Sequence, residues 1–395
     1  MEATDDTIYL DHAATTPVHP AVLDAMLPYF TARFGNPSSI YQLGQDGRAA
    51  LDRARAAVAR VLGCQPAEIL FTSGATESDN QALSGIAWHR RLQNPDGPPP
   101  HIVTTAIEHH AVLHTADWLE RQGCAVTRVP VDADGFVDPD DVARAIRPET
   151  CLVSVMYANN EIGSIQPIAE ISRIARDREI PFHTDAVQAA GALPLDVDAL
   201  GVDLLSLSAH KFYGPKGVGL LYVRRGTDIA YQQHGGGQES GRRGGTENVP
   251  GIVGLAAALE RAEAARAEYN RHCGTLRDRL YAGLAEAIPD LELNGPSDWD
   301  RRLPNNLNVS IRGVQGETAL LSLDMQGIAA SAGSACTTGN SQPSHVLQAL
   351  GYDDERCRAS LRLTLGWSNT EEQIDETIDV LADVAGRIRS LAGVV

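Results

Sequence analysis

Short apolar runs alternate with helical patterns along the middle of the chain. Between residues 68 and 223, apolar stretches of strand length are separated by segments whose apolar positions recur at the spacing of a helix face. Near-continuous apolar strands that alternate with helices are typical of a parallel sheet covered on both faces. The pattern therefore predicts an α/β fold with a mostly parallel sheet flanked by helices. The expected strands are residues 69–72, 102–106, 125–129, 152–157, 182–184, 204–207 and 218–223.

The helical patterns indicate where the covering helices lie and where the large domain ends. They fall at residues 47–62, 75–90, 110–122, 139–146, 167–178 and 187–192. A long Ala-rich helix at about 251–287 leads out of the large domain, and the rest of the chain mixes strands and helices. We therefore expect a large domain over residues 16–262 and a smaller α/β domain formed by residues 1–15 and 263–395. A glycine-rich loop is expected at 234–248 and an exposed loop at 295–304.

The charge of the chain limits the classes of partner that we expect it to bind. Its 395 residues carry a formal net charge of −18, and the pI is about 5.0. Such a surface repels phosphate backbones and anionic lipid headgroups, so we expect no direct binding of nucleic acid and none of membranes. No run of about 18 apolar residues is present, and the acidic residues 1–6 lack the basic and apolar stretches of a secretory signal. We therefore expect a cytoplasmic protein.

Six cysteines are spread along the chain, at positions 64, 124, 151, 273, 336 and 357. No two have the C-x-x-C spacing of a structural zinc site, and in a reducing compartment most should be free thiols. An inert buried thiol is the ordinary interpretation of each. Cys336 differs because it lies among small residues, from Ser331 to Gly339, which favours an accessible thiolate that can attack sulfur. A small residue in a tight turn explains this run equally well.

Only two lysines occur, Lys211 and Lys216, and the other 31 of the 33 basic side chains are arginines. A surface can use either cation, but a Schiff base needs an amine that can lose its proton, which a guanidinium cannot do. Lys216 lies in a Gly-Pro-Lys-Gly turn, the more ordinary context. Lys211 follows an apolar strand that also delivers Ser208 and His210. We therefore choose Lys211 as the candidate Schiff-base lysine.

Two further segments follow strands, at the edge where ligands collect in open α/β sheets. Residues 72–77, Thr-Ser-Gly-Ala-Thr-Glu, open a helix and can hold an anion on their backbone N–H groups. Helix capping by Ser and Thr is the structural alternative. Residues 183–188 place Asp185 after a very short strand, where a carboxylate can keep a pyridinium nitrogen protonated. Taken alone, an N-cap for the next helix is the simpler interpretation of Asp185.

These segments, in this order, resemble the cysteine desulfurases of the NifS/IscS group, in the class V aminotransferase superfamily. The resemblance runs through most of the chain, and so many long, collinear motifs are far more specific than any single one. The matching motifs are YLDHAATT at 9–16, GNPSS at 35–39, FTSGATESDN at 71–80, EH at 108–109, NNEIG at 159–163, GTEN at 245–248, and Arg362 ahead of LG at 365–366.

The resemblance implies a PLP-dependent transferase of fold type I, whose large domain binds pyridoxal 5'-phosphate (PLP). It implies that Lys211 forms the Schiff base and that His109 stacks on the ring and assists proton transfer. By the same resemblance, Asp185 pairs with the ring nitrogen of the cofactor and Gln188 with its ring hydroxyl. The cofactor phosphate is held by Ala75, Thr76, Ser208 and His210, and Thr246 reaches the phosphate of the neighbouring subunit. The substrate carboxylate is bound by Asn160 and Arg362, and Asn160 also belongs to the cofactor site. The contact from Thr246 implies a homodimer.

The reaction that the resemblance implies is the removal of sulfur from L-cysteine. The thiolate of Cys336 takes the substrate sulfur, which leaves a persulfide on the enzyme and releases L-alanine. The sulfur then passes to an acceptor protein, such as an iron–sulfur scaffold, or serves thio-modification.

The chain departs from the family pattern at three positions. Tyr41 stands where the motif usually ends in His, Ser240 where Arg is common, and Gly244 where Ser is common. These changes leave Lys211 and Cys336 intact and bear on dimer contacts. The chain also ends soon after its last expected helix, without the extended tail by which the housekeeping type docks its scaffold, so the acceptor is left open.

Three other functions remain as alternatives. A selenocysteine lyase or an aminotransferase belongs to the same superfamily, and a transaminase does not need Cys336. A metal-binding protein is suggested by His110 and His114, spaced i, i+4 beside His109, but no carboxylate or thiol completes the set, so we expect no metal. A non-catalytic sulfur carrier would require the loss of the lysine, and Lys211 is present.

Overall fold

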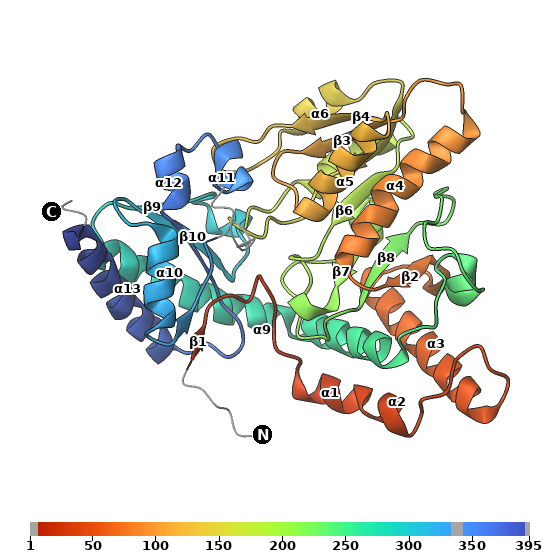
Figure 1. The fold of residues 1–395 in the computed structure, drawn as a ribbon, viewed down its shortest axis with the longest axis horizontal. Helices are drawn as coiled ribbons and strands as arrows, with labels where there is room; N and C mark the ends of the chain where they lie inside the picture. Colours follow the sequence, from red (N-terminus) through yellow and green to blue (C-terminus); the bar gives the residue numbers. More distant parts are fainter. Residues whose placement is uncertain (1–6, 333–342, 392–395) are drawn as a thin grey trace.

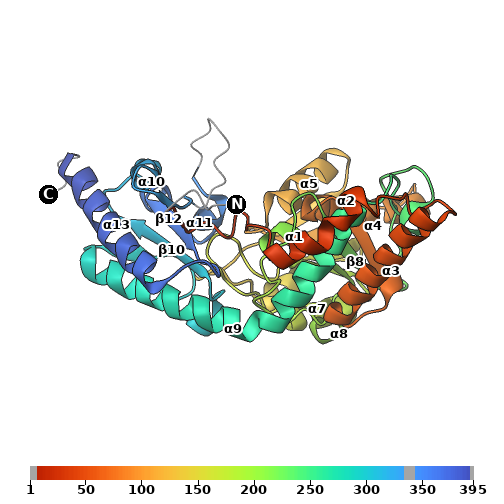
Figure 2. The same cartoon turned by 90° about the horizontal axis from the view of Figure 1, so that it is seen from below.

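A seven-stranded sheet and a three-stranded sheet, joined by one long helix, make up most of the fold, and a third sheet has only two strands (Figure 1). The computed structural model describes residues 7–332 and 343–391. The strands of the larger sheet lie between residues 69 and 223, and those of the smaller one between 291 and 364. Helix α9, Val249–Ala287, runs along both, as Figure 2 shows from below.

The larger sheet has the strand order β2-β8-β7-β6-β5-β3-β4. Strands β4, β3, β5, β6 and β7 are neighbours in that order and pair in parallel, and β8 is antiparallel to both β7 and β2. The prediction of a mostly parallel sheet is therefore confirmed. The strands are β2 Ile69–Thr72, β3 His101–Thr105, β4 Ala125–Val129, β5 Thr150–Ser154, β6 Phe182–Asp185, β7 Leu204–Ser208 and β8 Gly219–Val223.

Helices cover both faces of this sheet, because successive strand residues point to opposite sides. On β2, Leu70 packs in the core shared with α4 and α5, whereas Ile69 and Phe71 pack in the core shared with α3, α7 and α9. The helices of this part are α1 Pro20–Met26, α2 Pro28–Thr31, α3 Gln42–Leu62, α4 Ala75–Gln93, α5 His110–Arg121, α6 Pro139–Ala145, α7 Ile168–Arg176 and α8 Val197–Leu200.

The smaller sheet is antiparallel, in the order β12-β10-β9, and packs against the far half of α9. The N-terminal strand β1 pairs in parallel with β11, so the start of the chain lies beside its C-terminal part. The division at residues 15/16 and 262/263 remains a prediction. The elements here are β1 Ile8–Tyr9, β9 Leu291–Leu293, β10 Asn306–Ile311, β11 Ile328–Ala329, β12 Ser360–Thr364, α10 Gly316–Asp324, α11 His345–Ala349, α12 Asp354–Arg358 and α13 Glu371–Leu391.

One sequence-based expectation is wrong, and another holds only in part. Residues 187–192 form successive turns instead of a helix, and Gly191 among them has a left-handed φ of +79°. Residues 295–304 are exposed at Ser297, Asp298, Asp300 and Arg301, but Arg302 is only 1% exposed and Leu303 only 2%. The guanidinium of Arg302 donates to the carbonyl oxygens of Pro296 and Asn294, which allows a cation to be buried here without a carboxylate.

Among residues 7–332 and 343–391, no helix combines the length and the apolar character that crossing a bilayer requires.

A matched pair of leucines on α10 tests the core of the smaller sheet. Leu323 is 0% exposed, whereas Leu321 on the same helix is 69% exposed. We expect Leu323→Ala to lower the free energy of unfolding by about 2–5 kcal/mol, because it leaves a cavity. Leu321→Ala should change it by less than about 0.5 kcal/mol. Urea unfolding of the two variants measures both, and equal losses would contradict this core.

Candidate active site

The predicted site residues from four sequence segments meet at one edge of the larger sheet. β6 ends at Asp185 and β7 at Ser208, and a short 3₁₀ turn, Ala209–Lys211, follows β7 directly. Helices α4 and α5 begin at the same edge, with Gly74 and His109 as their N-caps. The carboxyl ends of parallel strands and the amino ends of helices therefore converge here, which is where α/β sheets bind ligands.

Lys211 is held by the backbone of the N-terminal segment. Its Nζ donates to the carbonyl oxygens of Ala13 at 2.6 Å and Ala14 at 2.7 Å. Burial lowers the pKa of Lys211 to about 8, and the positive charge of Arg362 acts in the same direction, against Asp11 and Asp185. About a tenth of this amine is therefore unprotonated at pH 7, far more than in an ordinary lysine, and the unprotonated amine is the form that attacks a carbonyl.

The start of α4 forms an anion cradle with the end of β7. The N–H groups in the first turn of a helix have no carbonyl partner within it, and here they belong to Ala75, which is buried, and Thr76, which is exposed. Ser208 lies beside this turn, because its Oγ is only 3.7 Å from where a Cβ on Gly74 would be. A Cβ on Gly219 would be 2.7 Å from the Gly74 backbone, so glycine lets β8 pass beneath the cradle.

His210 completes the cradle from the turn after β7. Its Nδ1 lies 3.1 Å from Thr15 Oγ1. Burial lowers the pKa of His210 to about 4, with Lys211 and Lys216 acting in the same direction, so the ring is neutral at pH 7. A neutral imidazole can donate one hydrogen bond to a phosphate oxygen without being charged.

Asp185 is buried at the end of β6. Its Oδ1 accepts from the Val187 N–H at 2.9 Å, and no helix follows, so the N-cap interpretation is wrong. Burial raises the pKa of Asp185, while the Val187 N–H and Lys211 oppose that rise. Gln188 lies in the following turns and donates from Nε2 to the Ala13 carbonyl at 3.0 Å. Gln188 therefore contacts the same N-terminal segment that holds Lys211.

His109 reaches the site from the start of α5. Its Nδ1 accepts from the Ala111 N–H at 3.1 Å, which fixes the ring as an N-cap. Part of the ring is open to solvent, but the surrounding protein excludes enough water to lower the pKa of His109 to about 4. The charge of Lys211, followed by that of His345, acts in the same direction. A neutral His109 near the Lys211 amine can accept a proton.

Arg362 enters from the smaller sheet, at the middle of β12. Its guanidinium donates to the Asn160 carbonyl at 3.1 Å and to Asp11 Oδ1 at 2.7 Å. Its Nε is buried and has no hydrogen-bond partner among the described residues. A guanidinium with a free N–H at a buried site is suited to a carboxylate ligand.

Thr246 is not brought into this group. Thr246 is exposed in the glycine-rich loop and lines a separate cavity of about 80 Å³ with Thr72, Ser73 and Gly217. Cys336 lies outside the described residues. The other five cysteines are free thiols, and burial raises the pKa of each of them. The pKa rises to about 12 for Cys64, Cys151 and Cys273, and to about 11 for Cys357.

The histidines considered for a metal site stack on one another. The ring centroids of His110 and His114 are 4.7 Å apart, and those of His110 and His345 are 4.6 Å apart. Over residues 7–332 and 343–391, no group of three or more His, Cys, Asp or Glu side chains is arranged to hold a metal ion. These contacts instead join the start of α5 to α11.

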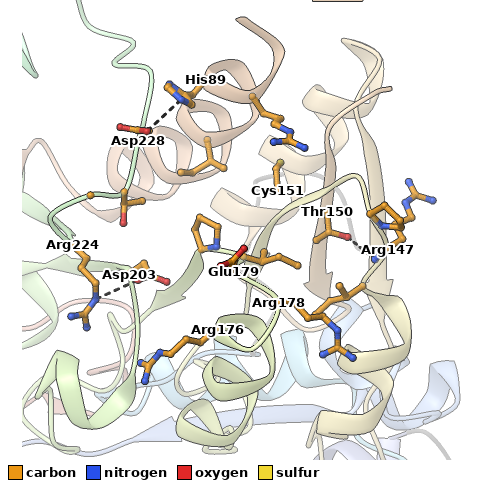
Figure 3. A pocket seen from close by; sticks show the side chains of 18 of the residues that line it. His89, Arg147, Thr150, Cys151, Arg176, Arg178, Glu179, Asp203, Arg224 and Asp228 are labelled. Atoms are coloured by element: carbon orange, nitrogen blue, oxygen red, sulfur yellow. Dashed lines mark hydrogen bonds and ion pairs between the residues drawn. The ribbon is translucent and has the colours of Figure 1, made fainter. Parts of the chain in front are cut away.

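The cavities add two further facts. A cavity of about 650 Å³ reaches Lys211 from the side of Tyr213 and Trp367. A larger one, of about 1000 Å³, opens where β5, β6 and β7 begin and is rimmed by Arg147, Arg178 and Arg224 (Figure 3). It lies at the opposite edge of the sheet and contains none of the predicted site residues.

Sequence reasoning did not single out the contribution of the N-terminal segment. Asp11 pairs with Arg362, and the carbonyls of Ala13 and Ala14 hold Lys211. Both features belong to the motif at residues 9–16. A carboxylate and several small residues directly after a strand are the signal that could have indicated them.

Comparison with known proteins gives a consistent result. The profile of the family described as aminotransferase class-V matches residues 8–377. The chain is 50% identical over 385 residues to cysteine desulfurase IscS of Clostridium botulinum, covering 98% of this chain and 96% of the relative. A solved structure described as a NifS-like protein has a TM-score of 0.89 at 39% identity, over 96% of this chain and 100% of that one. Another, described as SspA in complex with cysteine, has a TM-score of 0.79 at 37% identity, over 91% and 99%.

The titration of Lys211 tests the electrostatics of the site. In the cofactor-free protein we expect its amine to lose a proton near pH 8, and Asp185→Asn to lower that pKa further because a negative charge is removed. The Lys216→Arg variant leaves a single lysine, so one ¹³C-labelled lysine resonance reports the titration by NMR. A midpoint near that of a free lysine would contradict the burial of this amine.

Proposed function

Because the chain belongs to the aminotransferase class-V family and is a cysteine desulfurase, we propose that it holds PLP on Lys211 and moves the sulfur of L-cysteine to Cys336. The observation that carries this proposal is the setting of Lys211. A buried amine with its pKa lowered to about 8 lies within the electrostatic reach of Asp185, His109 and Arg362. These are the groups that a PLP enzyme acting on an amino acid needs around its lysine.

The residues of the site fit the cofactor. Lys211 would hold its aldehyde, Asp185 its ring nitrogen and Gln188 its ring hydroxyl. The first turn of α4 at Ala75 and Thr76, with Ser208 and His210, would hold its phosphate, because this cradle offers unpaired N–H groups and a hydroxyl. When bound, PLP supplies an electron sink for negative charge that develops at the substrate Cα.

Arg362 and Asn160 would orient the substrate. The free Nε of Arg362 gives the cysteine carboxylate a donor that no described residue occupies. The Asn160 carbonyl and Asp11 hold the rest of the guanidinium in place, so its orientation is set before substrate arrives. One structural neighbour is described as a complex with cysteine, which supports the same substrate class here.

Lys211 and His109 would handle protons at the substrate. The Lys211 amine would accept the Cα proton, since a pKa lowered to about 8 leaves part of it unprotonated near neutral pH. His109 has its pKa lowered to about 4, so it is a neutral acceptor at pH 7, next to the same positive charge. A well-placed proton acceptor of this kind contributes about 10²–10⁴-fold to the rate.

Cys336 would take the sulfur as a thiolate. Its Sγ attacks the substrate sulfur, an S–S bond forms, and the C–S bond breaks with its electron pair going to Cβ, which a proton then caps. The balance is one L-cysteine and one enzyme thiol in, one L-alanine and one enzyme persulfide out. The other five thiols suit this role poorly, because burial raises the pKa of each and so opposes the thiolate.

The partners and location follow from the same premise. We propose a homodimer in which Thr246 serves the cofactor phosphate of the neighbouring subunit, and its exposure in the glycine-rich loop supports that assignment. The persulfide would pass to an acceptor protein, such as an iron–sulfur scaffold, in the cytoplasm. Gly244 packs closely on Gly235, and a Cβ on residue 244 would lie 2.7 Å from the Gly235 Cα. Glycine in place of the family's usual Ser at position 244 therefore permits this loop conformation.

Paired variants test the two central residues. We expect Lys211→Arg to lose the yellow colour of bound PLP and all alanine formation, because a guanidinium cannot condense with an aldehyde, whereas Lys216→Arg keeps both. Cys336→Ala should bind PLP but form no persulfide, and Cys357→Ala should remain active. Absorbance, alanine yield and mass spectrometry of the protein measure these outcomes. Normal sulfur release by Cys336→Ala would refute the persulfide route.

Mixed dimers test Thr246. The Thr246→Ala variant should bind PLP about 10–100-fold more weakly, because a hydrogen bond to a charged phosphate is lost. Mixing it with Lys211→Arg should restore one tight site per dimer if Thr246 acts on the neighbouring subunit. If Thr246 served its own subunit, or if the protein were a monomer in solution, no tight site would return. Cofactor retention after dialysis measures the difference.

A further inference from the structure

A buried polar cluster lies between the larger sheet and α4, behind Asp185. At its centre is His183, which is 0% exposed. The Nδ1 of His183 lies 2.8 Å from Ser154 Oγ on β5, and its Nε2 lies 3.0 Å from Ser206 Oγ on β7. Asp79, on the first turns of α4 and 1% exposed, brings its Oδ1 to 3.5 Å from the same Nε2. The reaction proposed above uses none of these four groups.

Asp79 is an unusual carboxyl group because neither oxygen has a hydrogen-bond partner among the described residues. The ionisable groups that face it are Asp185 and His183 on β6 and Glu108 after β3. Two of these are carboxyls, and His183 is neutral because burial lowers its pKa to about 3. No cation therefore balances an ionised Asp79, and a lone carboxylate in a dry interior is strongly disfavoured.

Asp185 differs from Asp79 because its neighbours stabilise its ionised form. It is two residues beyond His183 on β6, so both side chains lie on the same face of the sheet. It receives a hydrogen bond from the Val187 N–H, and the charge of Lys211 favours its ionised form. Two carboxyls that share one water-free space divide a single charge between them, and the better-solvated one takes it.

We propose that Asp79 is a positioning residue that keeps its proton so that Asp185 alone carries the negative charge at the cofactor end of β6. One ring nitrogen of His183 donates to its serine and the other accepts from its serine, so the ring between Ser154 and Ser206 is neutral and provides no positive charge to balance Asp79. This inference rests on the proposed role of Asp185 toward PLP. It assigns Asp79 no contact with substrate or cofactor.

The stability of the cofactor-free protein reports the proton on Asp79. Burial, followed by the charge of Asp185, raises the pKa of Asp79 well above its ordinary value in the folded state, and the nearby hydroxyl of Ser206 opposes this rise without cancelling it. The stability that the neutral acid provides is therefore complete at low pH and is lost as the pH rises toward the folded-state pKa. Asp79→Asn has the same shape without the acid, so it removes this loss. Glu108 and Asp185 are titratable in both proteins.

The first arm of the test compares melting temperatures of cofactor-free protein between pH 4.5 and 8.5. Relative to wild type, Asp79→Asn should gain about 2–4 °C more at the high end than at the low end. The control is Asp24→Asn, an exposed aspartate on α1, which should show no such trend. A stability loss in Asp79→Asn that is constant or grows with pH would mean that Asp79 is ionised, and would overturn the proposal.

The second arm compares PLP affinity, which separates this inference from the proposed function. Asp79→Asn should stay within about threefold of wild type, because it preserves the neutral group, while Asp185→Asn should lose about 10-fold or more. A comparable loss in Asp79→Asn would show that its charge serves the cofactor, against the proposal. An unchanged affinity in Asp185→Asn would refute its role toward PLP and the action of Asp79 through it, whatever the stability profile shows about the proton.

Discussion

The ammonium of Lys211 on the carbonyls of Ala13 and Ala14 is the interaction on which the rest of the site depends. It ties the end of β7 to the N-terminal segment, which also begins as β1 beside β11 of the C-terminal part. Two residues before Ala13, Asp11 pairs with Arg362 on β12. One short segment therefore brings the lysine from the larger sheet and the arginine from the smaller one to the same place. Neither sheet alone contains both groups.

Exclusion of water sets the protonation of nearly every group in this place. Burial lowers the pKa of Lys211, His109 and His210 and raises that of Asp185. The result is an amine that loses its proton near pH 8, two imidazoles that are neutral at pH 7, and one carboxyl group whose ionisation depends on its neighbours. The same exclusion raises the pKa of the described thiols, which separates structural cysteines from a thiol that must react. Reactivity here comes from where water is removed as much as from which residues are present.

Water is also excluded from the polar cluster of Asp79, Ser154, His183 and Ser206 behind Asp185. A polar interior is stable only when each group has a partner or is neutral. His183 has two serine partners, whereas neither Asp79 oxygen has a hydrogen-bond partner among the described residues, so neutrality is the state that the surroundings of Asp79 favour. The charge that the cofactor site needs at Asp185 is thereby kept from spreading into the core. The start of α4, the end of β6 and the interior between them therefore set the protonation of Asp79 and Asp185 together.

Periodicity and composition alone determined the mostly parallel sheet and its strands, because each strand is a local apolar run. The two lysines pointed to Lys211, whereas the roles expected of Asp185 and of the cradle at Ala75 came from the resemblance of the surrounding motifs to a known family. The ion pair of Asp11 and Arg362 joins residues 351 positions apart, and no local pattern predicts such a partner. The turns at 187–192, the burial of Arg302 and the isolation of Asp79 were also decided only by the tertiary structure. Each depends on which groups from distant segments are close enough to replace water, and the order of residues does not specify that distance.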